Sequence, residues 1–317
     1  MSIRRRVLLS EPISQIGIDL LSERADFEIA ASADPESLAR VVRDFDALIV
    51  RSTRVPAAVF ETSERLRVLG RHGAGLENID IAAARQRGVR IVSTPGANAA
   101  SVAEFVMLAA LTLARRPQAA SDALRRGELS QDGSLPGAVD RAGYSGRTLV
   151  GRKIGIVGFG AIGRQVRMMA SGFGMKVAAY DPFVGEFPEG VSRETLDELF
   201  RSCDVITLHV PLTDETRFLV DADRLSTMKP DALLINTARA QVVDAAAVAL
   251  ALDEQRLGGY AVDVYDPEPP SADDPLLHHS RILATPHMAA MTDGALEEMA
   301  RSVVTGVLDA LDELKGE

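Results

Sequence analysis

Three glycines in the stretch KIGIVGFGAIGRQV have a spacing that can bind a nucleotide cofactor. Gly158, Gly160 and Gly163 form a G-x-G-x-x-G pattern that follows a strand-like run and opens a helix-like one. In this context the glycines permit a tight turn and close approach of the backbone to a pyrophosphate. The N-terminus of the following helix then offers its free N–H groups to the phosphates. We predict a dinucleotide site, rather than a glycine-rich turn without a ligand.

Asp181 ends the next strand-like run, in VAAYDP, near the offset at which an acid accepts hydrogen bonds from the adenosine ribose. An acid at this place also repels the 2′-phosphate of NADP. Pro182 and Phe183 follow it, and neither is an arginine. These residues predict NAD as the cofactor. A second Gly-x-Gly, at Gly73 and Gly75, lacks the third glycine and the later acid, so we do not interpret it as a dinucleotide site.

A nicotinamide cofactor implies hydride transfer, which on a ketone also needs a proton donor and a group that holds the substrate. Arg239 in NTARA, Glu268 in VDVYDPEPP and His287 in ILATPHMAAM each follow a strand-like run. Carboxyl ends of parallel strands meet at one edge of a sheet, where ligands bind. Each residue alone could be an ordinary surface or core residue, but their joint placement favours catalysis.

His278 and His279 are adjacent with no acid cluster beside them, so we predict no metal site.

Composition limits the class of protein. The 317 residues exceed what one hydrophobic core usually serves, which predicts two domains. A net charge of −10 argues against nucleic acid as a partner, because phosphate binding needs a basic surface. Cys203 is the single cysteine, so a reducing cytoplasm is expected. The N-terminal run VLL is too short for a signal peptide, and the apolar run 102–114 falls short of the ~20 residues that cross a bilayer.

Short apolar runs alternate with helix-like patterns along the chain. This alternation predicts an α/β protein with parallel sheets and right-handed crossovers. The strand-like runs are 6–10, 47–50, 67–71, 89–93, 153–158, 176–181, 204–210, 232–237, 259–264 and 281–286. The shorter helix-like patterns are 37–45, 161–173, 195–202 and 243–255.

Two long helices are expected at the junctions between the two groups of strands. One spans about 100–115 and begins with a capping-box pair, Ser101 and Glu104. The other spans about 292–314 and would return the chain to the first domain. After the first helix, the segment GELSQDGSLPGAVDRAGYSGRTLVG is rich in Gly, Ser and Pro and is expected to be irregular.

Several motifs, in order along nearly the whole chain, resemble the D-isomer-specific 2-hydroxyacid dehydrogenase family. They are LIVRSTRV, GRHGAGLENID, TPGANAASVAE, the glycine-rich turn, NTARA, VDVYDPEP and TPHMAA. This family includes 3-phosphoglycerate dehydrogenases and hydroxypyruvate and glyoxylate reductases. The resemblance implies two Rossmann-like domains with parallel sheets. The substrate domain would be discontinuous and flavodoxin-like (1–99 plus 288–317), and residues 100–287 would form the NAD-binding Rossmann domain.

The resemblance also assigns roles to the residues at the strand ends. Arg239 resembles the arginine that holds the substrate carboxylate and keto oxygen, a task that suits a planar guanidinium. His287 resembles the acid/base that protonates the keto oxygen, and Glu268 the carboxylate that pairs with it. An adjacent carboxylate favours the imidazolium and keeps a proton available near neutral pH. Asp263 matches the position that holds the nicotinamide carboxamide, although by itself it could merely cap a loop.

Further contacts follow from the same resemblance. On the substrate side they involve Arg51, Ser52, Arg239 and the backbone N–H groups of Ala74 and Gly75. The implied cofactor contacts are Gly158, Gly160, Ala161, Ile162, Gly163, Asp181, Val210, Pro211, Thr216, Thr237, Ala238, Asp263 and Ala289.

The chain departs from the family pattern at the presumed pocket. Ala240 and Gln241 follow Arg239 where the family often has glycine, and MAAM follows His287. The loop 127–148 is also longer than expected. Because the sequence ends at Glu317, we expect no regulatory domain of the kind that many phosphoglycerate dehydrogenases carry.

The expected function is an NAD-dependent D-2-hydroxyacid dehydrogenase or 2-keto acid reductase. Arg51, Arg54, Arg71 and His72 lie in or beside the presumed substrate loops and would favour an anionic small acid, such as 3-phosphoglycerate, hydroxypyruvate or glyoxylate. These substrates remain alternatives at this point. An NAD(H)-sensing binding protein of the corepressor type is the alternative from another class, since such proteins share the fold and the Arg–Glu–His set. We expect a cytoplasmic homodimer without a membrane or nucleic-acid partner.

Overall fold

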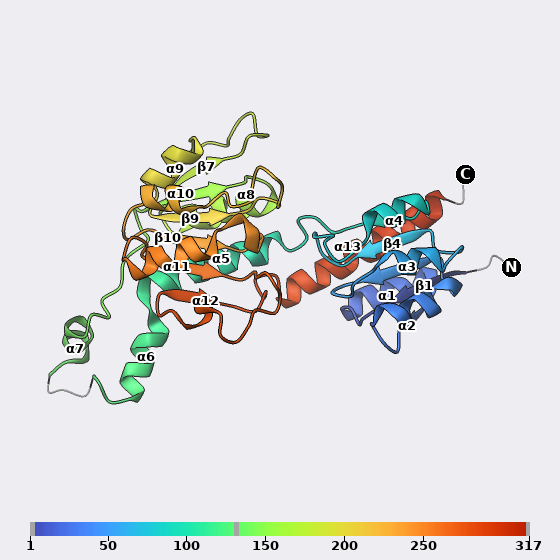
Figure 1. The fold of residues 1–317 in the computed structure, drawn as a ribbon, viewed down its shortest axis with the longest axis horizontal. Coiled ribbons are helices and arrows are strands. Elements are labelled where there is room, and N and C mark those ends of the chain that lie inside the picture. The colour runs from blue at the N-terminus through green and yellow to red at the C-terminus, as the bar shows by residue number, and fades with distance from the viewer. Residues whose placement is uncertain (1–3, 130–132, 315–317) are drawn as a thin grey trace. The chain divides into compact units, whose positions relative to one another are not determined.

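The computed structural model of the chain describes residues 4–129 and 133–314. The chain divides into two compact units. The first comprises Met1–Ala99 and Ala290–Glu317, and the second comprises Ala100–Ala289. Each unit is built on one parallel sheet with helices on both faces (Figure 1). Within the described residues, none of the helices has the length and apolar character needed to cross a membrane.

Five parallel strands form the sheet of the first unit, among the described residues. They are β1 (Arg5–Leu9), β2 (Ala25–Ile29), β3 (Ala47–Val50), β4 (Val68–Arg71) and β5 (Arg90–Val92). Their order in the sheet is β2-β1-β3-β4-β5, which is the flavodoxin-like order that was predicted. The winding direction reverses between β1 and β3. Sheets of this kind bind ligands beyond the carboxyl ends of the two strands at that switch point.

Helices cover both faces of this sheet. One face packs on α1 (Gln15–Arg24) and α13 (Asp293–Glu313), and the other on α2 (Pro35–Val41), α3 (Ala57–Glu61) and α4 (Ile81–Gln86). A 3-10 turn, η1 (Val42–Asp44), follows α2. Adjacent strand residues serve opposite cores, since Val7 packs with Val303 of α13 while Leu8 packs with Val59 of α3. Burial of both faces explains why strands such as ALIV are continuously apolar.

The sheet of the second unit has seven described strands, all parallel. They are β6 (Lys153–Val157), β7 (Lys176–Tyr180), β8 (Val191–Arg193), β9 (Val205–Leu208), β10 (Leu233–Asn236), β11 (Gly259–Val262) and β12 (Ile282–Ala284). Their order is β12-β11-β10-β9-β6-β7-β8. The chain starts in the middle with β6, runs outward to β8, and then returns to β9 on the other side. This is the predicted Rossmann winding, with its switch point between β6 and β9.

Several helices pack against the sheet of the second unit. On one face, α8 (Ala161–Gly172) packs on β6 and β7, and Leu113 of α5 (Ala99–Arg115) lies against the start of β11. The opposite core contains side chains of α9 (Leu196–Ser202), α10 (Ala222–Thr227) and α11 (Ala245–Asp253). A short helix, α12 (Pro275–His278), packs beside β12, and a 3-10 turn, η2 (Ala240–Val242), follows β10.

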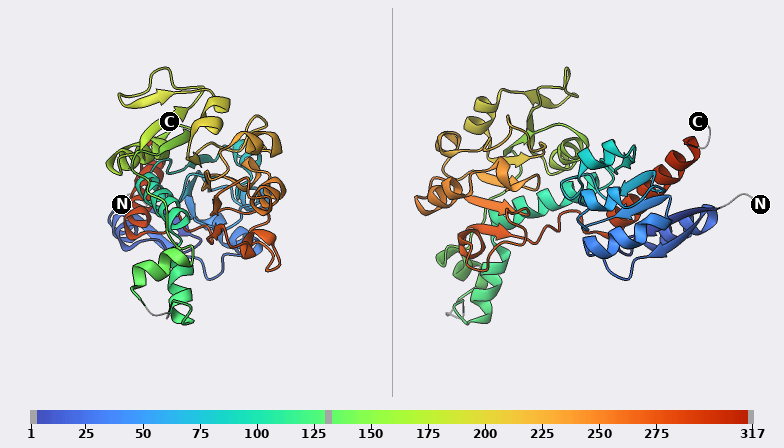
Figure 2. Two further views of the ribbon diagram at one scale, coloured as in Figure 1. Left: turned by 90° about the vertical axis from the view of Figure 1, so that its left-hand side faces the viewer. Right: turned by 45° about the vertical axis from the view of Figure 1, so that its right-hand side comes forward.

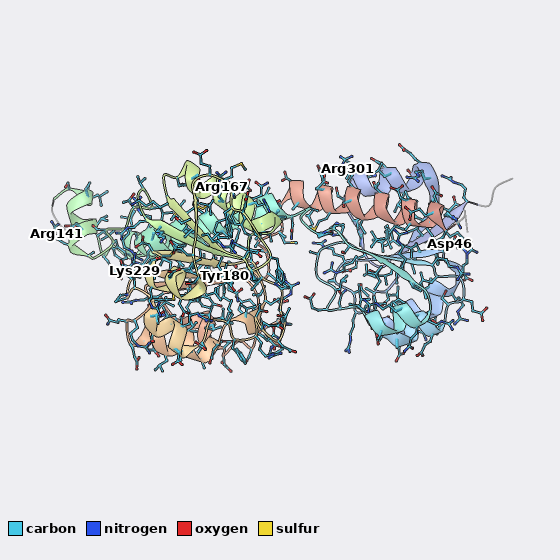
Figure 3. The ribbon with its side chains drawn as sticks, turned by 90° about the horizontal axis from the view of Figure 1, so that it is seen from above. Asp46, Arg141, Arg167, Tyr180, Lys229 and Arg301 are labelled. Carbon is cyan, nitrogen blue, oxygen red and sulfur yellow. The ribbon has the colours of Figure 1, made fainter. Side chains whose placement is uncertain are left out.

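Two further helices, α6 (Pro117–Arg125) and α7 (Leu135–Arg141), extend away from the sheet of the second unit. Figures 1 and 2 show this extension from several directions, and Figure 3 places Arg141 of α7 at its outer end. The expectation of an irregular segment after α5 was wrong for 135–141, because Pro136 in the first turn of α7 is compatible with a helix start. Residues 130–132 of that segment lie outside the described residues.

Other local features also differ from the expectations. Helix α5 begins at Ala99, so Ser101 lies inside the helix and the predicted capping box is wrong. Two alanines before Ser101 extend the helix, since alanine has the highest helix propensity. Strands β2 and β8 were not predicted. Both are sheet-edge strands with few buried side chains, and so they lack a continuous apolar run.

Candidate active site

The glycine-rich turn joins β6 to α8 at the switch point of the second unit. Gly158 has a φ of +91°, and a Cβ there would lie 2.4 Å from the carbonyl oxygen of His209, which follows β9. A Cβ on Gly163 would lie 2.3 Å from the carbonyl oxygen of Gly158. At Gly160, by contrast, a Cβ would have nothing within 4 Å. Gly158 and Gly163 are therefore required by the close packing of the turn. Gly160 leaves open space at the N-terminus of α8, which fits a pyrophosphate-bearing ligand.

Asp181 follows β7 and is fixed against this turn. Its Oδ2 accepts a hydrogen bond from the backbone N of Phe159 at 2.8 Å, and its Oδ1 accepts one from the backbone N of Phe183 at 2.9 Å. The acid therefore lies beside the glycine turn, as recognition of the adenosine ribose requires.

The loop after β9 forms the other side of the switch point. Thr216 Oγ1 donates to the carbonyl oxygen of Pro211 at 2.6 Å and accepts from the backbone N of Thr213 at 2.7 Å, which ties the loop into a compact turn. His209, at the start of this loop, is half-buried with its Nδ1 shielded from solvent, and burial lowers its pKa to about 3. Its Nε2 lies 3.0 Å from Thr207 Oγ1. The ring is therefore neutral and serves the packing of the loop.

The turn after β10 carries Arg239 and is held by the side chain of Asn236. Asn236 is fully buried, its Oδ1 accepts from the backbone N of Ala238 at 3.0 Å, and its Nδ2 donates to the carbonyl oxygen of Arg239 at 2.9 Å. Arg239 Nη1 donates to the carbonyl oxygen of Ala238 at 2.7 Å. Between them, the buried Thr237 Oγ1 has no hydrogen-bond partner within the described part of the chain. A buried hydroxyl of this kind fits a bound cofactor that would supply the partner.

Glu268 and His287 lie within hydrogen-bonding distance of each other, as the pairing expected from the sequence requires. His287 Nδ1 lies 2.9 Å from Glu268 Oε2 and 3.0 Å from Oε1, and both side chains are about half exposed. The backbone N of Tyr265 donates to Glu268 Oε1 at 3.2 Å. His287 has a φ of +52°, a strained conformation for a non-glycine residue, and strain of this kind clusters at functional sites. The pairing leaves Nε2 on the opposite edge of the ring.

Asp263 organises the segment around His287. Its carboxylate is 1% exposed and accepts from Thr285 Oγ1 at 2.6 Å and from the backbone N atoms of Met288 and Ala289, each at 2.8 Å. These bonds attach 288–289 to the second unit, which places the junction after Ala289 instead of after His287. A carboxylate has about four acceptor sites, so a donor from a cofactor could still be accommodated.

Two observations concern the loops of the second unit that carry Arg239, Glu268 and His287. Gln241 Nε2 donates to the carboxylate of Asp266, which joins the loop after β10 to the loop after β11. A pocket of about 610 Å³ lies beside the Glu268–His287 pair. Its remaining lining is mostly apolar and comprises Tyr265, Pro269, Pro270, Leu277, Ala284, Thr285 and Pro286.

In the first unit, the presumed substrate loops follow β3 and β4. Arg51 is half-buried, and its Nη2 lies 3.2 Å from the sulfur of Met291. Ser52 donates both its backbone N–H and its hydroxyl to the carboxylate of Glu11. Ala74 is exposed and Gly75 half-buried, in the turn after β4.

Metal-ligand clusters do not occur in the described ranges, where no group of three or more His, Cys, Asp or Glu side chains could hold an ion. His278 and His279 have separate neighbours. His278 Nε2 lies 2.7 Å from the carbonyl oxygen of Ala272, and His279 Nε2 lies 3.5 Å from Asp253 Oδ1.

Three residues of this architecture were missed from the sequence. Asn236 holds the Arg239 turn, Thr285 bonds to Asp263, and Glu11 binds the loop after β3. Only Asn236 carries a local signal, because asparagine at the end of a strand often forms a turn with the backbone two residues on. The other two depend on which strands become neighbours.

Comparison with known proteins identifies relatives of the whole chain. Residues 107–289 match the family described as D-isomer specific 2-hydroxyacid dehydrogenase, NAD binding domain. D-3-phosphoglycerate dehydrogenase of Methanocaldococcus jannaschii is 37% identical over 92% of this chain and 54% of its own length. Hydroxypyruvate reductase of Thermotoga maritima is 33% identical over 97% of this chain and 99% of its own length. The crystal structure of the TT0316 protein of Thermus thermophilus matches with a TM-score of 0.86 and 32% identity over 97% of both chains. The chain spans about half the length of several curated relatives.

Proposed function

Because the chain belongs to the D-isomer-specific 2-hydroxyacid dehydrogenase family, we propose that it is an NAD-dependent dehydrogenase that interconverts 2-hydroxy and 2-keto acids. The observation that carries the proposal is the Glu268–His287 pair, at the same sheet edge as the glycine-rich turn. Bound NAD would supply or accept the hydride. The remaining tasks, which are to move a proton and to hold a carboxylate, fall to the side chains of this chain.

His287 is proposed as the acid/base. Since its Nδ1 faces Glu268, the transferable proton would sit on Nε2, at the far edge of the ring. Glu268 would hold the ring in this orientation through its contacts with Nδ1. Arg239 would bind the substrate carboxylate and keto oxygen, because a guanidinium forms paired hydrogen bonds with planar anions.

The proposed cofactor contacts all lie in the second unit. They are Gly158, Gly160, Ala161, Ile162, Gly163, Asp181, Val210, Pro211, Thr216, Thr237, Ala238, Asp263 and Ala289. Asp181 would favour NAD over NADP through its charge. Asp181→Ala should therefore narrow the ratio of kcat/KM for NADH over NADPH, and an unchanged ratio would count against this role.

The first unit, residues 1–99 and 290–317, is proposed as the substrate domain. Arg51, Ser52 and the backbone of Ala74 and Gly75 would meet the substrate. A small anionic acid such as 3-phosphoglycerate, hydroxypyruvate or glyoxylate is supported by the positive charges near these loops and by the names of the relatives. The exposed hydroxyl of Ser52 can contribute to binding only as an acceptor while it donates to Glu11.

We also propose that the protein is a cytoplasmic homodimer. Large apolar side chains are exposed on the helices after residue 99, namely Leu108 (56%), Leu124 (52%) and Leu135 (55%). A second copy of the chain would cover such side chains on the projecting α6 and α7. Light scattering should give a dimer mass, and Leu124→Glu combined with Leu135→Glu should reduce it to that of a monomer.

The decisive experiment is a steady-state assay with NADH and NADPH against a panel of 2-keto acids that includes 3-phosphohydroxypyruvate, hydroxypyruvate and glyoxylate. Oxidation of NADH by at least one acid supports the proposal and identifies the substrate class. Tight NADH binding without turnover on any acid would refute the enzymatic proposal and favour an NAD(H)-sensing binding protein.

A further inference from the structure

Glu11 occupies an unusual position in the first unit. It follows β1, and the loop Arg51–Thr53 follows the neighbouring strand β3, so both lie at the switch point of this sheet. Ligands of open α/β sheets bind beyond the carboxyl ends of the strands at such a point. The side chain at this place is a carboxylate, which a role in anion binding would not predict.

The carboxylate of Glu11 is bound by every residue of the loop. Oε2 accepts from the backbone N of Arg51 at 3.2 Å, of Ser52 at 2.8 Å and of Thr53 at 3.2 Å. The hydroxyl of Ser52 donates to Oε1, and the hydroxyl of Thr53 donates to Oε2 at 3.0 Å. Burial alone would raise the pKa of Glu11, but the bonds from Ser52 and Thr53 outweigh it and lower the pKa to about 2. The group is therefore charged across the physiological range.

These bonds extend to the second presumed substrate loop. Asn78 Nδ2 donates to the carbonyl oxygen of Thr53 at 2.6 Å, and Asn78 Oδ1 accepts from Arg71 Nε at 3.2 Å. Arg71 is the last residue of β4, directly before the turn that contains Ala74 and Gly75. Glu11 thus stands at the start of a hydrogen-bond chain that joins the loops after β3 and β4.

Apart from Glu11, the loop is anchored mainly at Thr53, whose hydroxyl also lies 3.0 Å from Ser10 Oγ and whose carbonyl oxygen accepts from Asn78. Ser52 and Arg54 are exposed, and of the four residues 51–54 only Thr53 is buried. The bonds of Glu11 also differ from those of a carboxylate that caps a helix. Asp34 accepts from the backbone N of Ser37 and so stabilises the first turn of helix α2, whereas Glu11 bonds a loop that lies outside any helix or strand.

We propose that Glu11 is a positioning residue for substrate binding, because its carboxylate holds Arg51–Thr53 in the conformation from which Arg51 reaches the substrate. The proposal rests on the proposed function. It adds a residue that would act through Arg51 and would affect substrate affinity more than the chemical step.

The test compares the kinetics of Glu11→Gln, which keeps the shape but loses the charge, with those of Asp34→Asn. The second variant is the matched control, because Asp34 is also a hydrogen-bonded carboxylate of the first unit, with a pKa lowered to about 2 by bonds from Ser32 and Ser37. Glu11→Gln should raise KM for the keto acid by roughly 10–100-fold, with kcat within about threefold and NADH binding unchanged. Asp34→Asn should leave KM unchanged, and Glu11→Asp should recover part of the loss.

Two further measurements separate positioning from a general loss of structure. In an Arg51→Ala background, Glu11→Gln should add little to KM, because the two residues act through one contact. Hydrogen exchange in Glu11→Gln should be faster at residues 51–53 and unchanged in the strands, which can be measured even if the variant is less stable.

The outcomes distinguish this inference from the proposed function. If the wild-type protein reduces a 2-keto acid but Glu11→Gln keeps the wild-type KM, or changes KM additively with Arg51→Ala, the inference is wrong and the function stands. If the wild-type protein reduces no keto acid, both fail. A KM increase that is absent in the Arg51→Ala background and in Asp34→Asn supports both.

Discussion

The switch points of the two sheets solve the same problem of ligand binding in different ways. In the second unit, the turn after β6 contains Gly158 and Gly160, and a Cβ at Gly160 would meet open space. In the first unit, the backbone N–H groups of the loop after β3 are already occupied by Glu11. The second unit therefore presents backbone to a ligand, which suits phosphates, while the first can present mainly side chains such as Arg51.

In both units, a carboxylate that follows one strand binds backbone N–H groups of the loop after the neighbouring strand. Glu11 binds the loop of the strand beside its own, and Asp263, directly after β11, binds the loop after the neighbouring strand β12. The difference is burial, since Asp263 is 1% exposed while Glu11 is only partly covered. The buried carboxylate holds the proposed catalytic histidine, and the more accessible one holds the proposed substrate arginine. We therefore expect variants of Asp263 to affect turnover and stability, and variants of Glu11 to affect substrate affinity.

The largest effect should come from His287, the proposed acid/base in the second unit, because the first unit has no proposed proton donor. His287→Ala should lower turnover by ~10²–10⁴-fold, because it removes the proton donor, with little change in NADH binding. His278→Ala is the control, since this exposed histidine contacts only a backbone carbonyl among the interactions seen here. Stopped-flow or steady-state NADH oxidation measures the effect. Unimpaired turnover of His287→Ala would remove this histidine from the mechanism.

The next largest effect is expected at the glycine-rich turn after β6, where the backbone would bind the cofactor phosphates. Gly160→Val should fold normally, because a Cβ there contacts nothing within 4 Å, yet it should weaken NADH binding by roughly 10–100-fold by filling the space before α8. Gly185→Val, at another glycine with open space around it, should bind NADH normally. Calorimetric titration measures both. Equal affinities in the two variants would mean that the glycine turn does not receive the cofactor.

Asp263→Asn tests the buried carboxylate. One of its three donors would face an amide N–H instead of an acceptor, which should cost about 1–3 kcal/mol of folding free energy and lower kcat by ~10-fold through a displaced His287. Urea unfolding and steady-state kinetics measure the two effects, with the exposed Asp273→Asn as control. If Asp263→Asn raised KM and left kcat unchanged, the expectation that Asp263 affects turnover and Glu11 affects substrate affinity would be wrong.

The smallest effect concerns the pH dependence of stability. The pKa of Glu11 is lowered to about 2 in the folded chain from an ordinary value of 4.5, so its stabilisation is complete above that ordinary value and is lost as the pH falls towards 2. After allowance for solvent screening it amounts to roughly 1 kcal/mol. The difference in unfolding free energy between wild type and Glu11→Gln should shrink as pH falls from about 5 towards 3. A constant difference would argue against the charged hydrogen bonds.

Much of the site could be predicted because it follows the local pattern of a parallel sheet. Gly158, Gly160 and Gly163 were found from spacing, and Arg239, Glu268 and His287 from their places after apolar runs. The short edge strands β2 and β8 and helix α7 were not, because exposed elements lack the apolar periodicity on which such predictions depend.

The fold class, the dinucleotide turn and the identity of the residues that end the central strands of the second unit could be read from the sequence. Tertiary structure alone decided which carboxylate holds which loop. Glu11 and Ser52, or Asp263 and Ala289, are far apart in the chain and meet only because their strands are neighbours in the sheet. Strand order is a global property, set by how helices cover both faces. The resemblance to the family implied it, but no local pattern of residues shows which side chains it brings together.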